Sequence, residues 1–133
     1  MSSVAQVMRR ELKQIAHDAP VKEAAQRMKN ERIGSLFIEK GGALVGIVTD
    51  TDVVRRAVAD GSDLTKTQVH TIMTSPIATI ESNRTMQDAH DMMGDLSVRH
   101  LGVTEKGKLV GIVSVRDLLV YYKRVSEPKI AQD

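Results

Sequence analysis

Two pairs of residues in this sequence combine a hydroxyl group with a carboxylate three positions later. Thr49 and Asp52 form the first pair, and Ser114 and Asp117 form the second. Each pair follows a short apolar run and precedes a helical pattern, so it lies at a predicted strand-to-helix junction. The N–H groups and the positive dipole end of a helix start attract phosphate, and a carboxylate can accept hydrogen bonds from two adjacent ribose hydroxyls. The chemistry that these residues offer is therefore the binding of an anion or a sugar.

The same pairs have a plainer interpretation as capping boxes, in which Asp takes the place of the usual Glu or Gln. A helix start needs such residues whatever the protein does, so capping alone is the favoured interpretation of one isolated pair. Ligand binding becomes the favoured interpretation only if a wider sequence pattern surrounds both pairs.

Such a pattern exists, because the chain repeats itself with a constant shift of 65 residues and no gap across roughly fifty positions. The matching positions are Val7-Met8 with Ile72-Met73, Ile15 with Ile80, Ala24 with Ala89, Met28 with Met93, and residues 44–48 with residues 109–113. The repeat indicates a tandem duplication of one βαββα unit.

The pattern of apolar residues predicts the elements of each repeat. We expect a first repeat at residues 1–61, a linker at 62–68, a second repeat at 69–125 and a fraying tail at 126–133. In the first repeat, a strand is expected near residues 12–16, a helix at 21–29 after Pro20, hairpin strands at 35–39 and 43–48, and a closing helix at 53–58. In the second, the corresponding segments are 77–81, a helix with an inner stripe of Met86, Ala89, Met93 and Leu96, hairpin strands at 99–104 and 108–113, and a closing helix at 115–124.

The expected fold class is α/β (α+β), with two βαββα repeats related by a pseudo-twofold axis. The two sheets would bury their apolar faces against each other, with the helices outside. This arrangement would bring both hydroxyl–acid pairs toward clefts between the halves, where ligands tend to bind.

Composition excludes several functional classes. The 133 residues carry 19 Lys and Arg against 17 Asp and Glu, in scattered order, which is too mixed for a strongly electrostatic partner such as nucleic acid or a membrane surface. There is no cysteine, so disulfides and thiolate metal sites are excluded. The start of the chain has no secretory pattern, and no apolar stretch is long enough to span a membrane, so we expect a cytoplasmic protein.

The two G-h-h-[TS]-x-x-D segments at residues 46–52 and 111–117, the leading Val7-Met8 and Ile72-Met73, and the βαββα order resemble a tandem pair of CBS domains, also called a Bateman module. The resemblance covers residues 4 to 124. It implies a regulatory module, not an enzyme, that binds AMP, ADP, ATP or S-adenosylmethionine in the clefts between the repeats. It implies no obligatory cofactor, a homodimer shaped as a flat disc, and an effector protein that reads the module in trans.

The resemblance also assigns roles to residues. Asp52 and Asp117 would take the ribose hydroxyls, with Thr49 and Ser114 near the phosphate. Adenine would be held by Ile77, Ala78 and Thr79 facing Asp52, and by Leu12, Lys13 and Gln14 facing Asp117. Basic residues at the start of the second strand meet phosphates in this family, which points to Arg99 and His100; the first repeat has Gly34-Ser35 at that place.

Two other functions stay open on the residues alone. One is a dimerising scaffold with empty or vestigial clefts, in which Thr49 and Ser114 only cap helices. The other is an enzyme, which ranks low because there is no P-loop, metal-ligand set or activated nucleophile. Asp88, Asp91 and Asp95 share a helical face that we interpret as solvated, with no metal site, and the pairs Arg9-Arg10 and Arg55-Arg56 are likewise interpreted as solvated.

Overall fold

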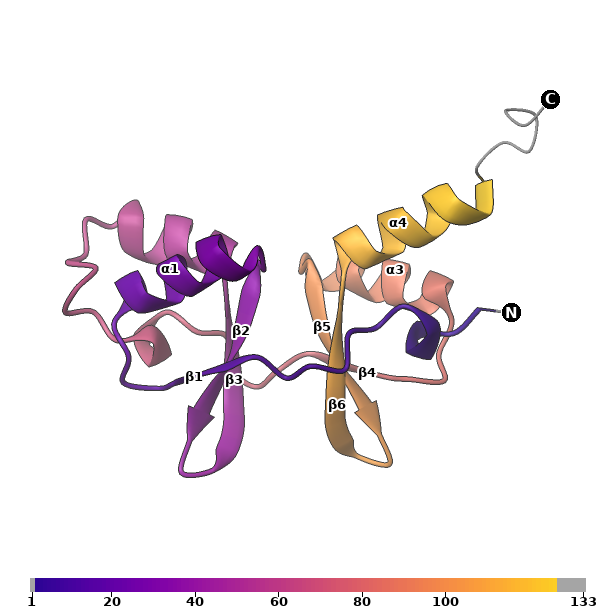
Figure 1. Cartoon of the computed structure of the whole chain (residues 1–133), viewed down its shortest axis with the longest axis horizontal. Coiled ribbons are helices and arrows are strands. Elements are labelled where there is room, and N and C mark those ends of the chain that lie inside the picture. The colour runs from indigo at the N-terminus through magenta and orange to yellow at the C-terminus, as the bar shows by residue number, and fades with distance from the viewer. Residues whose placement is uncertain (1, 127–133) are drawn as a thin grey trace. The chain divides into compact units, whose positions relative to one another are not determined.

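A computed structural model describes residues 2–126, which divide into two compact units (Figure 1). The first unit comprises residues 12–77, and the second combines residues 2–11 with residues 78–126. The predicted tail lies outside the described residues except for Ser126, which ends the last helix. The protein is a mixed α+β chain with one three-stranded sheet in each unit.

The first unit follows the predicted βαββα order. Its elements are β1 (Gln14–Ala16), α1 (Val21–Glu31), β2 (Ser35–Lys40), β3 (Ala43–Thr49), α2 (Asp50–Asp52), the π-helix η2 (Val53–Val58) and the 3-10 turn η3 (Val69–Thr71). Strand β1 pairs parallel to β2, which requires the crossover made by α1, and β2 pairs antiparallel to β3. Gly41 and Gly42 both have positive φ, as a two-residue hairpin turn with the twist of its strands demands.

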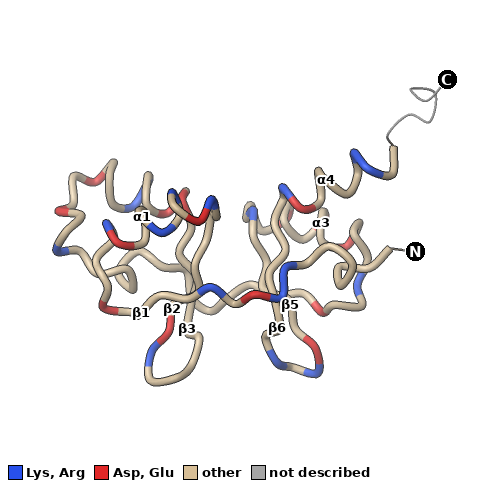
Figure 2. The backbone as a smooth tube through the Cα atoms, viewed as in Figure 1, with Lys and Arg blue, Asp and Glu red and all other residues tan. Residues whose placement is uncertain are grey.

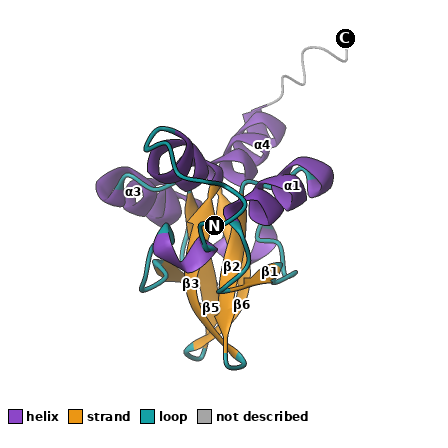
Figure 3. Ribbon diagram, turned by 90° about the vertical axis from the view of Figure 1, so that its left-hand side faces the viewer, coloured by secondary structure: helices purple, strands orange, loops and turns teal. Residues whose placement is uncertain are grey.

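The second unit repeats this order with β4 (Thr79–Glu81), α3 (Met86–Leu96), β5 (His100–Glu105), β6 (Lys108–Ser114) and α4 (Val115–Ser126), and it begins with the 3-10 turn η1 (Val4–Gln6). Its sheet has the same pairing as the first, parallel between β4 and β5 and antiparallel between β5 and β6. Figure 3 shows the strands in orange, with the helices in purple and the loops in teal that connect them.

Each unit takes its opening segment from the other sequence repeat. We call residues 2–11 and residues 67–76 the opening segments; they correspond under the shift of 65. Arg9 and Ile112 exchange backbone hydrogen bonds of 2.9 Å in both directions, so the first opening segment extends the sheet edge at β6. Thr74 and Ile47 do the same at β3, with N···O distances of 2.8 and 3.0 Å. The boundaries of the two compact units therefore lie between residues 11 and 12 and between residues 77 and 78. The segment 62–68, which connects the two sequence repeats, lies inside the first unit.

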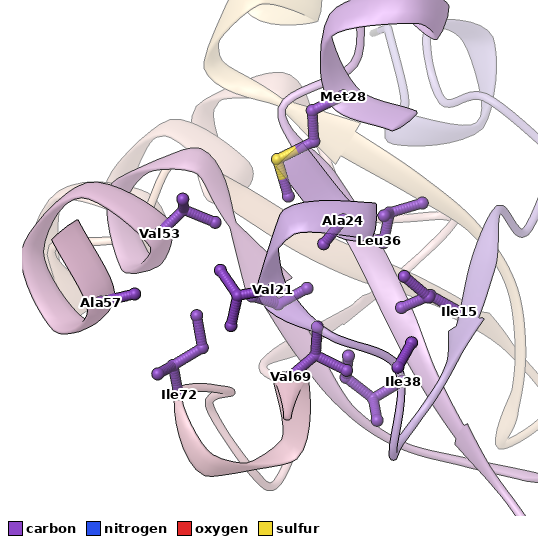
Figure 4. Close-up of a cluster of buried hydrophobic side chains, with 12 residues drawn as sticks. Ile15, Val21, Ala24, Met28, Leu36, Ile38, Val53, Ala57, Val69 and Ile72 are labelled. Atoms are coloured by element: carbon purple, nitrogen blue, oxygen red, sulfur yellow. The ribbon is translucent and has the colours of Figure 1, made fainter. Parts of the chain in front are cut away.

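Apolar side chains from helix, sheet and opening segment fill each core. In the first unit the buried cluster includes Ile15, Val21, Ala24, Leu36, Ile38, Val48 and, from the opening segment, Val69 and Ile72 (Figure 4). The second cluster is built from the corresponding positions and includes Val4. Met86, Ala89 and Met93 are buried as predicted, but the prediction for Leu96 was wrong, because its side chain is 52% exposed. Leu96 is the last residue of α3, and the chain turns away at Ser97, which has a positive φ of 56°.

The closing helices of the two units are wound differently. In the first unit the turn Asp50–Asp52 leads into the π-helix, where Ala59 N donates to Val54 O over five residues at 2.9 Å. In the second unit α4 is a regular helix of 12 residues. Acidic and basic residues are interspersed along both units (Figure 2), and no helix within residues 2–126 is long and apolar enough to cross a bilayer.

Candidate functional site

The first hydroxyl–acid pair forms a reciprocal capping box at the end of β3. Asp52 N donates to Thr49 Oγ1 at 3.2 Å, and Thr49 N donates back to Asp52 Oδ2 at 2.9 Å. The Thr49 hydroxyl also donates to Oδ2 at 3.0 Å. The predicted capping role is confirmed. Both bonds that the carboxylate accepts end on Oδ2, so the second carboxylate oxygen, Oδ1, takes no part in the box.

The second pair repeats this geometry at the end of β6. Ser114 N and Oγ donate to Asp117 Oδ2 at 2.8 and 3.0 Å, and Asp117 N donates to Ser114 Oγ at 3.2 Å. The Asp52 side chain is 12% exposed and the Asp117 side chain 19% exposed, so both carboxylates are largely withdrawn from water. Two largely buried carboxylates thus lie at equivalent strand-to-helix junctions, each with one oxygen outside its box.

Each box carboxylate has a guanidinium beside it, which sequence reasoning missed. Arg56 Nε lies 3.6 Å from Asp52 Oδ1, and Arg9 Nε lies 3.9 Å from Asp117 Oδ2. The Asp52–Arg56 pair has the i,i+4 spacing of a helical ion pair, a signal that could have found it. Arg9 has no such local signal, because it reaches Asp117 from the opening segment. The interpretation of these two arginines as merely solvated was therefore incomplete.

A third capping box of the same chemistry begins α3. Asp88 N donates to Thr85 Oγ1 at 3.0 Å, and Thr85 N donates to Asp88 Oδ2 at 3.2 Å. The Arg84 guanidinium and the Thr85 bonds hold the pKa of the Asp88 carboxyl below its usual range. This box follows a turn, not one of the two hairpins, so the box alone does not mark a ligand site. Within residues 2–126, no group of three or more His, Asp or Glu is arranged to hold a metal ion.

The other predicted residues of the second unit lie in or just before strands β4 and β5. His100 lies opposite Ser114 in the β5–β6 register, and Arg99 O accepts a hydrogen bond of 2.9 Å from Val115 N, the first residue of α4. Thr79 pairs with Gly102, and Ala78 O accepts from Gly102 N at 2.9 Å. In the first unit, Gly34 O has the place of Arg99 O and accepts from Asp50 N at 2.9 Å.

Three predicted adenine-pocket residues, Leu12, Lys13 and Ile77, lie in the first unit and are half-buried. Lys13 O accepts from Phe37 N at 2.9 Å, and Lys13 Nζ donates to Glu31 Oε1 at 2.6 Å. Arg27 binds the second oxygen of Glu31 at 2.7 Å. Hydrogen bonds from Arg27 and then Lys13 lower the pKa of Glu31 to about 2. The Lys13 ammonium is thus held at the end of α1.

Comparison with known proteins gives a consistent result. The family model of the CBS domain matches residues 4–59 and again residues 69–124. The chain is 32% identical over 120 residues to the CBS domain-containing protein YhcV of Bacillus subtilis (strain 168), covering 90% of this chain and 85% of that protein.

Solved structures match over similar lengths. A proposed signal-transduction protein with CBS domains from Burkholderia ambifaria MC40-6 superimposes with a TM-score of 0.86 at 28% identity, over 96% of each chain. A hexameric CBS-CP12 protein from bloom-forming cyanobacteria gives a TM-score of 0.84 at 27% identity, over 96% of this chain and 76% of that one.

Proposed function

This chain belongs to the CBS-domain family, and we propose that it is a regulatory module that binds an adenosine-containing ligand at Asp52, at Asp117 or at both. The ligand class is AMP, ADP, ATP or S-adenosylmethionine, and the module needs no obligatory cofactor. A change in ligand occupancy would be read by an effector protein in trans, which requires that the ligand bind one arrangement of the module better than another.

One observation carries this proposal: the capping box uses only Oδ2 of Asp52 and of Asp117. The box fixes each carboxylate at a strand-to-helix junction, while Oδ1 lies outside the box. A fixed oxygen of a largely buried carboxylate suits the paired hydroxyls of a ribose, because the protein has already ordered the acceptor before the ligand arrives.

A thermal-shift panel with AMP, ADP, ATP, S-adenosylmethionine and GTP, at fixed salt and matched magnesium, tests the proposal. A ligand at about a hundred times its dissociation constant should add about 2.7 kcal/mol to the free energy of unfolding, because it binds only the folded state. We expect an upward shift in melting temperature with adenosine compounds and none with GTP. A flat panel would favour the alternative, a ligand-free dimerising scaffold with vestigial clefts.

The variant Asp52→Ala separates ribose binding from helix capping, and Asp88→Ala is its matched control. Both substitutions remove the acid of a capping box, so both should cost about 1 kcal/mol of stability. Only Asp52→Ala, alone or with Asp117→Ala, should weaken nucleotide affinity measured by calorimetry. Equal affinities in the Asp52/Asp117 double variant and the Asp88 variant would contradict the assignment of the ribose site.

We further propose that the working form is a homodimer. Large apolar side chains on the closing helices are exposed, among them Val54 and Val58 in the first unit and Leu119, Tyr122 and Val125 in the second. Apolar groups gathered on one helix mark an interaction surface more often than scattered single ones do. The hexameric relative supports association within the family but does not give its geometry here.

A further inference from the structure

The two guanidinium groups beside the box carboxylates come from positions that do not correspond in the repeat. Under the shift of 65, the counterpart of Arg56 is Tyr121 and the counterpart of Arg9 is Thr74. Duplication of one unit would have copied a basic residue to the equivalent position of both units. Here a positive charge lies beside both carboxylates, but Arg56 supplies it in the first unit and Arg9 in the second. Duplication of a single arginine therefore does not explain the arrangement.

Hydrogen bonds hold both arginines in position. Arg56 Nη1 donates to Ile72 O and to Met73 O at 3.3 Å each, which ties the guanidinium to the opening segment of the same unit. Arg9 is anchored by its backbone, which exchanges two hydrogen bonds of 2.9 Å with Ile112, two residues before Ser114. Each side chain nevertheless keeps much of its surface in solvent, 53% for Arg56 and 43% for Arg9.

Neither guanidinium saturates its carboxylate. The N···O separations of 3.6 and 3.9 Å are ion-pair distances that exceed a hydrogen bond. An ion pair at this distance, with about half of its guanidinium side chain in solvent, gains little by itself. The side-chain N–H donors of Arg9, and those on Nε and Nη2 of Arg56, therefore remain available to an anion that arrives beside the carboxylate. A guanidinium suits phosphate oxygens in particular.

We propose that Arg9 and Arg56 select a phosphate-bearing adenosine ligand over uncharged adenosine and over cationic S-adenosylmethionine. This inference rests on the proposed function, because it takes the ribose to be bound by Asp52 or Asp117. A 5′-phosphate is attached to that same ribose, so its charge is confined close to the guanidinium. The sulfonium group of S-adenosylmethionine would bring a positive charge to the same place.

The test compares two double variants with the same net charge. Arg9→Gln/Arg56→Gln removes the two guanidinium groups beside the carboxylates, and Arg10→Gln/Arg55→Gln removes their sequence neighbours. Calorimetry measures the affinities of ADP, adenosine and S-adenosylmethionine at one salt concentration. We expect the Arg9/Arg56 variant to bind ADP roughly tenfold more weakly, which is the loss of one charge-assisted hydrogen bond, and to bind adenosine within about twofold of the parent. The control variant should keep the ADP preference of the parent.

A third variant, Arg9→Lys/Arg56→Lys, covers the event that the glutamine variant does not fold, and it should retain most of the preference for ADP. Two results would overturn the inference in a protein that still binds adenosine. One is that the Arg9/Arg56 variant binds ADP and adenosine more weakly by the same factor; the other is that the control variant loses as much ADP affinity as the Arg9/Arg56 variant. Failure of the parent protein to bind any of the three compounds would overturn the proposed function itself, so the two failures are distinguishable.

Discussion

Gly111 lies in β6 where the first opening segment crosses the strand, and it has no room for a side chain. A Cβ at this position would lie 2.5 Å from Arg9 O and 3.3 Å from Met8 Sδ. Its counterpart Gly46 would meet Met73 Sδ at 2.6 Å and Thr74 O at 2.9 Å. The glycine that opens each G-h-h-[TS]-x-x-D segment is therefore required by the backbone that crosses it.

We expect Gly111→Ala to destabilise the protein by about 1–3 kcal/mol, because the crossing backbone must move. Gly94→Ala is the control: Gly94 lies in α3 with open space around it, so alanine there should stabilise by about 0.5–1 kcal/mol. Urea denaturation of both variants measures the difference. A Gly111→Ala variant as stable as its parent would show that the crossing is looser than the hydrogen bonds between Arg9 and Ile112 imply.

Single residues were predictable from the sequence only where the signal was local. The Thr49–Asp52 box is visible as a hydroxyl three positions before an acid, and the structure contains it. Arg9 could not be assigned to Asp117, because the two residues are 108 positions apart and no periodic pattern links them. The candidate site was thus predictable in part: its acids were, Arg56 could have been found from its i,i+4 spacing to Asp52, and Arg9 could not.

Among the elements, too, some features were predictable from the sequence and others, such as the packing of the opening segments, were not. The apolar pattern predicted both hairpins and all four main helices to within a few residues. It could not show that Val4 packs with the second repeat. Similarity between the repeats shows which positions correspond, but it does not show in which of the two hydrophobic cores each residue is buried. The π-helix was also beyond the pattern, since the apolar positions of Val53–Val58 fit a helix of either winding.

Val4 and Val69 are fully buried counterparts in the two cores, so they offer a matched test of this exchange. Each change to alanine should cost about 2 kcal/mol through lost burial and the cavity left behind. Hydrogen exchange should then lose protection at β4–β6 in Val4→Ala and at β1–β3 in Val69→Ala. The opposite pattern, with Val4→Ala exposing β1–β3, would show that each opening segment packs with its own repeat.

For the molecule as a whole, α4 carries an exposed apolar face on which the proposed homodimer would form. Leu119, Tyr122 and Val125 recur at intervals of three along this helix, so they share a face, and Leu119 and Val125 are 63% and 60% exposed. Covering this face with a second copy would remove apolar surface from water.

We expect Leu119→Lys/Val125→Lys to convert the proposed homodimer into a monomer, because two charges would be buried without partners. Val120→Lys is the control, since Val120 is exposed on the other side of α4 and should leave the dimer intact. Sedimentation equilibrium gives the mass of each variant. A parent protein that sediments as a monomer at micromolar concentration would contradict the homodimer.

The exchange of opening segments has a consequence for the ancestry of such a chain. A polypeptide with a single repeat would lack the segment that completes its own core, so two copies would have to trade these segments, as in domain swapping. Folding would then depend on protein concentration. Fusion of two copies keeps each missing segment on the same molecule, at a millimolar effective concentration, and folding becomes independent of dilution. Gene duplication would in this way have turned an obligate partnership between molecules into one within a single chain.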